Sequence, residues 1–402
     1  MTLTSEHDEL LSRTTAKKLV MAVCALVLGV TLYAGFSPFT PHLKNEVHWL
    51  DGQNGLYFGE YASILSSAPL ALDGPPDGPC TVELWLQPGL LDDSNTMLAF
   101  QTPESPLRFR IEQNESALRF DRQESGRYPE KGAEYIWMAG VVEENKPILI
   151  TVTGGRRGTT VYLNGVLARS APEFHLVRRD LTGGIVVGNS AVDNDSWSGI
   201  LRGIGIYNQE LSADQVRKNY EDWTRTGQPA TLDSASAVYP FSEHSGNTVH
   251  NLVHNPDMPG ADLYIPDYYL VLYPEFLEPV WRSWGFNWAF WKDCIVNVVG
   301  FMPFGFAFCV YFALTRPLKR AVLLSIVLGS AMSLLIETTQ YYLPTRDSET
   351  IDFLNNCIGT SLGAFCCLPG FVQNLLARLG MAPFSRQISH SSPSMSPETA
   401  AK

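Results

Sequence analysis

Four apolar stretches divide the chain into two kinds of sequence. They cover residues 18–36, 287–314, 321–343 and 353–372, and few charged residues lie within them. A helix needs about 20 mostly apolar residues to cross a hydrocarbon core that is ~30 Å thick. The pattern therefore predicts four transmembrane helices, and the long polar segment between the first two predicts a separate folded domain. The mean hydropathy of the whole chain, -0.03, hides this division because it averages two unlike parts.

The first apolar stretch has features of a signal peptide as well as of a membrane anchor. Lys17 and Lys18 precede it, as basic residues precede the apolar core of a signal peptide. The stretch from Leu19 to Phe36 is long for such a core, however, and no small-x-small cleavage site follows it. We therefore expect an uncleaved transmembrane helix over residues 18–39.

Basic residues near the helix ends indicate the orientation, because such residues favour the cytoplasmic side of a membrane. If both chain ends are cytoplasmic, one set of basic residues lies on that side: Arg13, Lys17, Lys18, Arg316, Lys319, Arg320, Arg378 and Arg386. The opposite side then has the polar domain and the loop 344–351, whose only basic residue is Arg346. We expect residues 1–17 and a disordered tail, residues 373–402, in the cytoplasm.

The polar domain shows the patterns of short strands. In the segment Cys80–Gln87, the apolar residues Val82, Leu84 and Leu86 alternate with polar residues such as Glu83. This alternation is typical of a strand that buries one face and exposes the other. Glu83 and Gln87 therefore lie on the opposite face of this strand from Val82, Leu84 and Leu86.

The polar domain also has turn signals, and its composition limits how it can be stabilised. Residues 148–163 predict a β-hairpin, and Asn164-Gly165 predicts the next tight turn because both residues accept a positive φ. Many such strands and turns predict an all-β sandwich. Of seven cysteines only Cys80 lies in this domain, so its own core must stabilise it without a disulfide. The net charge of -12 is concentrated here, which argues against nucleic acid as a partner.

Two segments of this domain resemble a known family: ILITVTGGRRGTTVYLNGVLARS (148–170) and IVVGNSAVDNDSWSGILRGIGIYNQELSADQVRKNYEDW (185–223). They are similar to LamG-type (laminin G-like) concanavalin A-like domains, which show the same hairpin ending in Asn-Gly and the same Gly-Asn and Trp-x-Gly motifs. The resemblance implies a jelly-roll sandwich of the lectin/glucanase type. Residues 237–251 are similar to the opening strand of such domains but come last. This order implies a permuted jelly roll whose closing strand comes from the C-terminal side.

The resemblance implies carbohydrate binding, but proteins with this fold have many functions. A glycosidase needs two carboxylates at the scissile bond, and the Glu-x-Asp-x-x-Glu motif of glucanases with this fold does not occur in the sequence. Asp193-Asn194-Asp195 suits either a calcium ion or a turn, and such clusters are more often turns. Three histidines are typical of polar loops rather than of a metal site: His244, His250 and His254. We predict no metal and no cofactor.

Aromatic residues are dense between the sandwich and the second apolar stretch: Tyr264, Tyr268, Tyr269, Tyr273, Trp281, Trp284, Trp288 and Trp291. Tyrosine and tryptophan prefer the headgroup region of a membrane. We therefore expect residues 266–286 to lie at the outer membrane surface, before three helices over residues 287–372.

A polar motif occurs twice in this last part. Asp293–Gly300 has the pattern Asp-x-x-x-Asn-x-x-Gly, and Asp352–Gly359 repeats it. Spacings of four and seven place each set on one helix face. Both helices run in the same direction, so the two sets are expected at the same depth and indicate a parallel internal repeat. The helix between them has a stripe of small residues that ends in a carboxylate: Ser325, Gly329, Ser333 and Glu337.

Positions in the last three helices resemble the VanZ-like membrane family: Asp293, Asn297, Phe301, Pro303, Gly305, Glu337, Gln340, Arg346, Asp352, Asn356, Gly359 and Gly363. The resemblance implies a membrane fold and a place in the cell envelope. Members of this family are linked to tolerance of glycopeptide antibiotics. The resemblance implies no particular reaction, because the family has no shared one.

Seven polar residues form the predicted ligand-binding site, for a lipid or glycan headgroup: Asp293, Asn297, Glu337, Gln340, Arg346, Asp352 and Asn356. Ionisable residues within a membrane are costly and are therefore functional candidates. Alternatively, these residues only join helix ends through hydrogen bonds worth about 0.6 to 2 kcal/mol each. An enzyme acting on lipid-linked substrates is another alternative, with Glu337 or Asp352 as acid/base and Arg346 holding a phosphate. A non-catalytic scaffold is the last alternative.

The sequence therefore predicts a multi-domain protein. An all-α four-helix transmembrane bundle has an all-β concanavalin A-like jelly-roll sandwich, residues 50–265, inserted between its helices 1 and 2. The expected partners are membrane lipids and an envelope glycan or glycolipid. The expected location is the bacterial inner membrane, with the sandwich on the periplasmic side.

Overall fold

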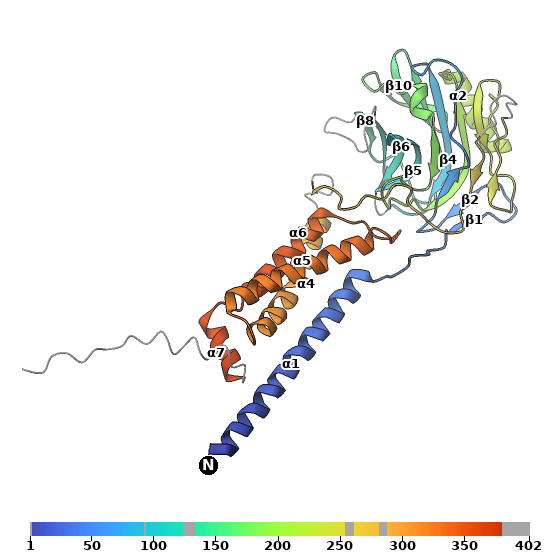
Figure 1. Cartoon of the computed structure of the whole chain (residues 1–402). Coiled ribbons are helices and arrows are strands. Elements are labelled where there is room, and N and C mark those ends of the chain that lie inside the picture. The colour runs from blue at the N-terminus through green and yellow to red at the C-terminus, as the bar shows by residue number, and fades with distance from the viewer. Residues whose placement is uncertain (1, 92–93, 124–133, 254–260, 281–287, 380–402) are drawn as a thin grey trace, which may run out of the picture. The chain divides into compact units, whose positions relative to one another are not determined.

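The chain divides into two compact units. The computed structural model describes residues 2–91, 94–123, 134–253, 261–280 and 288–379. The helical unit comprises residues 1–39 and 275–402, and the sandwich unit comprises residues 40–274 (Figure 1). Each unit has its own hydrophobic core.

The sandwich consists of two antiparallel sheets. The first runs in spatial order through β1 (Val47–Trp49), β2 (Leu56–Phe58), β13 (Gly199–Tyr207), β4 (Cys80–Pro88), β9 (Ile148–Gly155), β10 (Gly158–Leu163) and β11 (Val166–Ala171), and β14 (Ala235–Tyr239) also pairs with β13. The second runs through β15 (Thr248–Val249), β16 (Leu263–Tyr264), β3 (Ile64–Ser66), β12 (Gly184–Val187), β5 (Ser94–Thr102), β6 (Ser105–Asn114), β7 (Ala117–Arg122) and β8 (Glu134–Met138).

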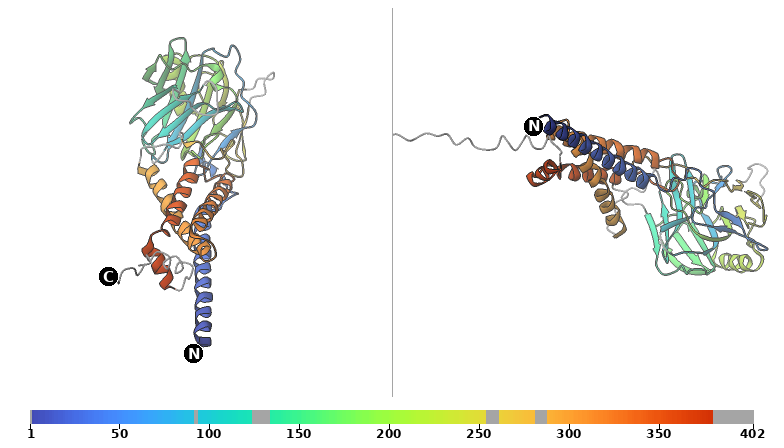
Figure 2. Two further views of the ribbon diagram at one scale, coloured as in Figure 1. Left: turned by 60° about the vertical axis from the view of Figure 1, so that its left-hand side comes forward. Right: turned by 90° about the horizontal axis from the view of Figure 1, so that it is seen from below.

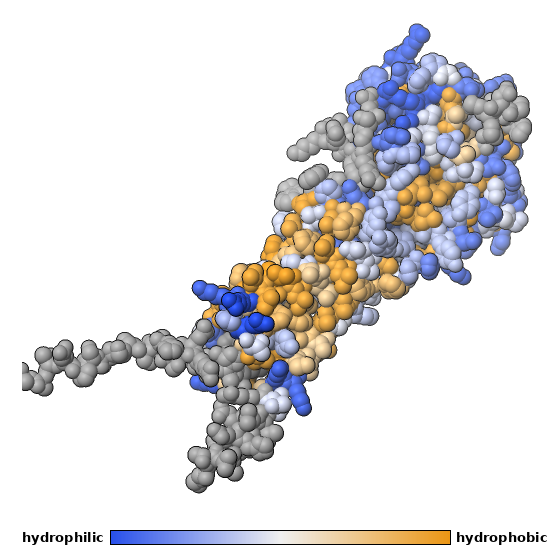
Figure 3. Space-filling view, viewed as in Figure 1, coloured by the Kyte–Doolittle hydropathy of each residue, from blue (hydrophilic) through white to orange (hydrophobic). Residues whose placement is uncertain are grey.

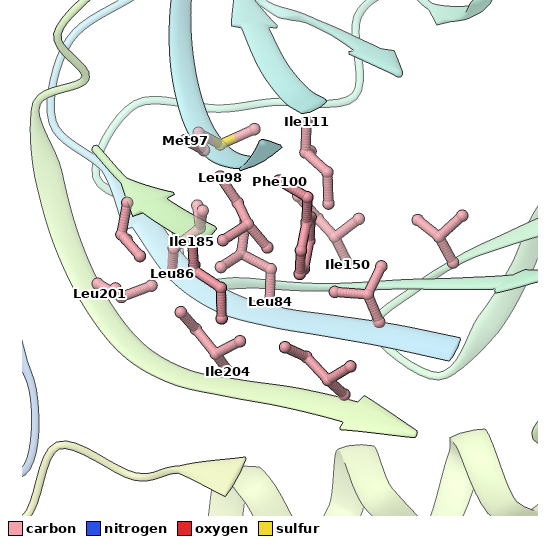
Figure 4. Packing of buried hydrophobic residues seen from close by; sticks show 14 of the residues in the cluster. Leu84, Leu86, Met97, Leu98, Phe100, Ile111, Ile150, Ile185, Leu201 and Ile204 are labelled. Atoms are coloured by element: carbon pink, nitrogen blue, oxygen red, sulfur yellow. The ribbon is translucent and has the colours of Figure 1, made fainter. Parts of the chain in front are cut away.

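Alternating apolar residues build the core between the sheets. Val82, Leu84 and Leu86 on β4 are fully buried or nearly so, as the sequence pattern predicts. Figure 4 shows Leu84 and Leu86 close to residues of the second sheet, among them Phe100 and Ile185. Apolar side chains from both inner faces therefore form one continuous core, and the predicted β-sandwich is confirmed.

The predicted hairpin and turn are confirmed. Strands β9 and β10 pair in antiparallel register from Gly155 and Gly158 to Ile150 and Leu163. Asn164 and Gly165 then have φ values of 51° and 78°, the left-handed conformations that a tight hairpin turn requires. The Asn164 side chain also accepts a 2.9 Å hydrogen bond from the backbone of Leu149, which fixes the turn to the neighbouring strand.

Glu83, on the face of β4 opposite Val82, Leu84 and Leu86, is completely buried as well. Helix α2 (Ala213–Thr226) supplies Asn219 and Trp223, which are completely buried and hydrogen-bond to Glu83. The helix begins at Ser212, whose side chain accepts a hydrogen bond from the backbone of Gln215 in a capping box. Because α2 covers this side of β4, the strand is buried on both faces.

The C-terminal part of the sandwich adds strands to both sheets. In the first sheet, β14 pairs with β13, with Val238 opposite Gly205. In the second sheet, β16 pairs with β3, with Leu263 opposite Ser66. Residues 237–251, which the sequence predicts as a closing strand from the C-terminal side, thus take part in both sheets, through β14 in the first and β15 in the second.

Two of the tyrosines expected at the membrane surface belong to the sandwich instead. The Tyr269 side chain is 2% exposed, and its hydroxyl donates a 2.5 Å hydrogen bond to Asn194 Oδ1. The Tyr273 N–H donates to Ala191 O at 2.8 Å, and its ring packs on an apolar cluster of the second sheet that includes Val186. These contacts bury the ring of Tyr269 and partly bury the ring of Tyr273, so the interfacial interpretation is wrong for them. Trp281 and Trp284 lie outside the described residues.

Five helices are described in the helical unit: α1 (Thr2–Phe36), α4 (Trp288–Ala313), α5 (Leu318–Gln340), α6 (Thr350–Phe365) and α7 (Gly370–Arg378). Three contain segments long and apolar enough to cross a membrane: Thr14–Phe36, Phe290–Ala313 and Leu318–Gln340. Figure 2 shows α4, α5 and α6 grouped together, in orange to red, and α1 also packs on α4 and α5. Figure 3 shows apolar side chains over much of the visible face of this unit.

The fourth predicted helix is broken. α6 ends at Phe365, and α7 begins at Gly370 after a bend of 69°, so together they pass as one span only if bent. Pro369 disfavours a helical conformation of the preceding residue, which explains why the apolar stretch does not form one straight helix. Helix α7 continues through residue 378, so the tail is not disordered from residue 373 onward. Residues 380–402 lie outside the described part of the chain.

Candidate functional site

Glycines bring α4 and α6 into close contact. A Cβ atom on Gly359 would lie 2.1 Å from Val298 O, and one on Gly363 would lie 1.9 Å from Met302 O. The residue numbers of the contact positions increase together along α4 and α6, so the two helices run parallel. Glycines spaced by four residues allow such close approach of two helices.

A stripe of small residues on α5 faces the same group of helices. Ser325 and Ser333 are completely buried, and a Cβ atom on Gly329 would collide with the side chain of Thr360 on α6. Glu337 continues the stripe and is 1% exposed. The predicted stripe is therefore confirmed as a packing surface, and it places a carboxylate among packed helices.

The polar residues near the N-terminus of α6 join two helices directly. Asn297 on α4 donates a 2.6 Å hydrogen bond from Nδ2 to Asp352 Oδ1. Asn356, one turn further along α6, donates from Nδ2 to Ser333 Oγ on α5 at 3.0 Å. The first turn of α6 is thus hydrogen-bonded to α4, and its next turn is hydrogen-bonded to α5.

Glu337 is held from the loop that connects α5 to α6. Its Oε2 atom accepts a 2.9 Å hydrogen bond from the backbone N–H of Glu349. The preceding residue, Ser348, is 2% exposed. The Glu349 partner comes from this loop, and no arginine or lysine side chain is shown bonded to Glu337 among the described residues.

Two further predicted site residues contact the end of α1. Gln340 donates from Nε2 to Gly35 O at 3.1 Å. The guanidinium of Arg346 donates from Nη2 to Ser37 O. These bonds fix the end of α1 beside the loop, and the Arg346 side chain otherwise stays exposed.

We use the term polar layer for the polar residues at this end of the helices: Asn297, Glu337, Gln340, Arg346, Asp352, Asn355 and Asn356. Three atoms of the layer are buried without a hydrogen-bond partner in the described part of the chain: Gln340 Oε1, Asn355 Nδ2 and Asn356 Oδ1. A buried polar atom without a partner costs about 1 to 3 kcal/mol. The layer therefore has unused capacity to donate and to accept hydrogen bonds.

Asp293 does not join this layer through a described contact. Its side chain is exposed on α4, although it lies close enough to Asp352 to act on it electrostatically. A Cβ atom on Gly300 would meet nothing within 4 Å, whereas Gly359 is packed against α4. The two copies of the motif thus have different surroundings, because α6 packs on both α4 and α5 while this face of α4 stays open.

Sequence reasoning missed Asn355 and Ser348. Asn355 is 7% exposed, and it lies next to the motif residue Asn356. Ser348 belongs to a loop, so helix periodicity gives no signal for it. The one available signal is its position four residues before Asp352 in a segment otherwise rich in charged and polar residues.

A second buried polar cluster lies in the sandwich around Glu83. Tyr207 OH donates to its carboxylate at 2.8 Å, Trp223 Nε1 at 2.9 Å and Asn219 Nδ2 at 3.2 Å. Burial raises the pKa of Glu83, and the hydrogen bonds from Trp223, Tyr207 and Asn219 offset part of that effect. Burial and the nearby Glu83 together raise the pKa of Tyr207 well above its ordinary value. A further donor, the Thr151 hydroxyl on β9, lies 3.5 Å from Oε1 of Glu83. The donors thus come from β9, β13 and α2, so the cluster fastens the helix to the sheet.

Asp195, in the loop after β12, takes part in an ion pair. Asp195 lies 3.5 Å from Arg110, which also contacts Glu112 and Asp121 at 2.9 Å each. The described residues contain no group of three or more histidine, cysteine, aspartate or glutamate side chains that could hold a metal ion. His254, one of the three loop histidines, lies outside them.

Two family models match the chain. The VanZ/LLP1 model matches residues 237–373, and the model of the concanavalin A-like lectin/glucanases superfamily matches residues 58–217. The chain therefore has a VanZ-like region and a concanavalin A-like domain, and both predicted resemblances are confirmed. The VanZ match begins before the helices, within strands that the structure places in the sandwich. A search of curated proteins finds no match to this chain.

Solved structures similar to this chain are distant. A Bacteroides ovatus protein named for carbohydrate binding is 9% identical with a TM-score of 0.37, and the match covers 56% of this chain and 58% of that one. A heptameric SAP-like pentraxin from Limulus polyphemus is 12% identical with a TM-score of 0.34, covering 57% and 95%. A Trypanosoma rangeli sialidase is 16% identical with a TM-score of 0.32, covering 43% and 28%. These scores are too low to argue for a shared ligand or activity.

Proposed function

We propose that the chain is an inner-membrane protein that crosses the membrane four times, with both chain ends in the cytoplasm. Its sandwich then lies outside, between the first and second crossings. Three long apolar helices, the bent pair α6–α7 and the basic residues Arg316, Lys319 and Arg320 between α4 and α5 support this topology. A reporter fused at residue 150 should be active only outside the cytoplasm, and one fused after Lys402 only inside.

Within this topology, the polar layer binds a lipid or glycolipid headgroup. The observation that carries this proposal is the set of buried atoms at Gln340, Asn355 and Asn356 that have no partner in the described part of the chain, in the same polar layer as the buried carboxylate of Glu337. Residues that only joined helices would be expected to satisfy one another, because an unpaired buried polar atom is costly. These atoms include both donors and acceptors, and a ligand with hydroxyl or amine groups and a phosphate offers partners for both.

Arg346 supplies the positive charge that such a ligand needs. Its side chain is exposed, it contacts Ser37 O through one nitrogen, and it acts electrostatically on Asp352. A guanidinium has five N–H donors, so bonding to one carbonyl leaves others for a phosphate. The proposal is therefore a binding site with a cation at its edge and a carboxylate inside.

The test compares retained lipid with stability. Glu337→Gln keeps the size of the side chain and removes its charge, so we expect thermal unfolding to change little. Loss of a charged hydrogen bond to a headgroup costs about 1.5 to 3 kcal/mol, so retained lipid should fall about tenfold or more. Lipid mass spectrometry of the purified full chain measures this, with the exposed helix residue Thr338, as Thr338→Val, for a control.

One pattern of results would remove the headgroup site. If Glu337→Gln, Asp352→Asn and Arg346→Gln all lower stability and lipid retention by similar amounts, the layer only joins helices. The same experiment addresses the enzyme alternative, since an altered lipid product in the wild-type sample would indicate a reaction.

A specific surface of the sandwich favours glycan recognition as its function. Tyr135 and Trp137 on β8 are 60% and 39% exposed, and they lie on the same face of the strand. The guanidinium of Arg119 on β7 lies 5.3 Å from the centre of the Tyr135 ring and is held by Asp121 at 2.9 Å. Exposed rings beside fixed charged groups suit a ligand with apolar faces and hydroxyl edges, which is the chemistry of a sugar.

A further inference from the structure

Residues 275–280 form a strap across the loop that holds Glu337. Glu278 and Glu349 form a bridge in parallel orientation. The Glu278 N–H donates to Ser348 O at 2.7 Å, and the Thr350 N–H donates back to Glu278 O at 3.0 Å. The strap thus pairs with the loop just before α6 in the way that one strand pairs with another.

Side chains reinforce this pairing. The Thr350 hydroxyl donates to Leu277 O at 2.9 Å, and the Leu277 N–H donates to Ser348 Oγ at 3.2 Å. The ring of Phe276 packs edge-on against Tyr341, with centroids 6.0 Å apart. Three consecutive strap residues therefore contact both ends of the loop between α5 and α6.

The hydroxyl of Ser348 lies at the point where the strap meets the polar layer. It accepts a hydrogen bond from the Leu277 N–H, and the next residue, Glu349, donates its N–H to the carboxylate of Glu337. The burial of Ser348 at 2% exposure leaves little room for water to replace its bond with Leu277.

We propose that Ser348 positions Glu337 through the N–H of the adjacent Glu349 and that the strap holds Ser348 in place. This proposal rests on the proposed headgroup site, whose carboxylate it orients. With the strap in place, Glu337 accepts from the Glu349 N–H, and this bond keeps its carboxylate turned toward the loop. Without the strap, Ser348 loses the backbone donor and the pairing that fix it, and the bond from Glu349 to Glu337 weakens.

The test measures amide hydrogen exchange at Glu349, whose N–H donates to Glu337, together with retained lipid. The protein is the full chain in nanodiscs of phosphatidylethanolamine and phosphatidylglycerol. We expect exchange at Glu349 to be about five- to tenfold faster in Ser348→Ala and in Thr350→Val, because each loses one hydrogen bond of the chain from strap to carboxylate. Retained lipid should fall in both, and Ser348→Thr, which restores a hydroxyl, should recover both measurements.

Two variants serve as matched controls. The hydroxyls of Ser361 and Thr338 bond to carbonyls of their own helices, at 2.8 Å and 2.7 Å, so Ser361→Ala and Thr338→Val should behave as the wild type. Exchange at Glu349 that stays at the control level in Ser348→Ala or Thr350→Val would overturn the proposal, as would failure of Ser348→Thr to recover it. Faster exchange with unchanged lipid retention would instead overturn the headgroup site and leave the positioning by Ser348 standing.

Discussion

Glu83 and Glu337 are both buried carboxylates, but their surroundings suit different purposes. Tyr207, Asn219 and Trp223 donate to Glu83 from within one domain, so its carboxylate oxygens already have hydrogen-bond donors. Glu337 is held by one loop, beside layer atoms that have no partner in the described part of the chain. The first arrangement is complete as it stands, whereas the second leaves hydrogen-bonding capacity for a ligand.

The Glu83 cluster predicts a pH-dependent stability of the sandwich. Burial raises the pKa of Glu83 in the folded state above the ~4.3 of an unfolded glutamate. Above that pH the folded state therefore binds more protons than the unfolded state, and the free energy of unfolding should fall as the pH rises through the folded-state pKa. Asp180, whose pKa burial also raises, contributes a slope of the same sign.

The measurement is urea denaturation of residues 40–274 between about pH 5 and pH 8, for the wild type and Glu83→Gln. The variant should show a shallower decrease of stability with pH, because a glutamine side chain cannot titrate. An unchanged slope would mean that Glu83 is ionised in the folded sandwich and that its hydrogen bonds outweigh its burial.

At this scale, the sequence identified polar residues on helices but not their partners. Spacings of four and seven residues were enough to place Asp352 and Asn356 on one helix face. The bond from Glu349 to Glu337 depends on the path of a loop, which no periodicity encodes. The burial of Glu83 was not predicted, because alternation describes a strand with one covered side and the helix that covers the other side comes over a hundred residues later.

Helix packing in the helical unit depends on where glycine allows two backbones to meet. Gly359 contacts the backbone of α4 at Val298, while the equivalent motif residue Gly300 faces open space. The pair therefore offers a matched comparison of the same residue type in the same sequence motif. A methyl group at residue 359 must push two helices apart, whereas one at residue 300 need not.

We expect Gly359→Ala to destabilise the helical unit by about 1 to 3 kcal/mol, the usual cost of forcing extra volume into a packed contact. Gly300→Ala should leave stability unchanged or raise it by up to about 1 kcal/mol, because alanine favours a helix. Thermal unfolding of the full chain in detergent measures both. Similar effects of the two substitutions would contradict the close α4–α6 contact.

Among the elements, the sequence predicted those with a strong period or turn signal. The hairpin β9–β10 and the stripe on α5 follow from alternation, from Asn164-Gly165 and from the spacing of small residues. The break between α6 and α7 was missed because Cys366, Cys367 and Leu368 continue the apolar run up to Pro369. Hydropathy measures whether residues suit a membrane, and it carries no information on the backbone conformation before a proline.

The whole molecule combines a domain that carries its own core with helices that expose apolar surface. The sandwich core draws on strands from Val47 to Leu263, and residues up to Tyr273 pack on the second sheet. The sequence placed the end of this domain at residue 265. The additional residues were assigned to the membrane surface because their aromatic composition suits both environments.

This difference predicts how fragments should behave. Residues 40–274, expressed alone, should fold as a β-rich monomer without a disulfide, whereas residues 40–263 lack Tyr269 and Tyr273 and should unfold at a lower temperature. Circular dichroism measures the two unfolding temperatures, and equal stability of the two fragments would show that the last residues add nothing to the sandwich.

The longer fragment should also bind soluble fragments of peptidoglycan glycan strands, and Trp137→Ala should weaken that binding. Calorimetry measures the binding, with the exposed Tyr57→Ala as a control.

The chain enters and leaves the sandwich at one place. Lys44 forms a bridge with Tyr268, the Asn45 side chain donates to Pro266 O at 2.9 Å, and the Tyr269 N–H donates to Leu43 O at 2.9 Å. A domain whose ends meet can be spliced into a loop of another protein without separating the two sides of that loop. The sandwich can therefore be inserted as one unit into a loop of a membrane protein, or exchanged for another domain, without interrupting a strand.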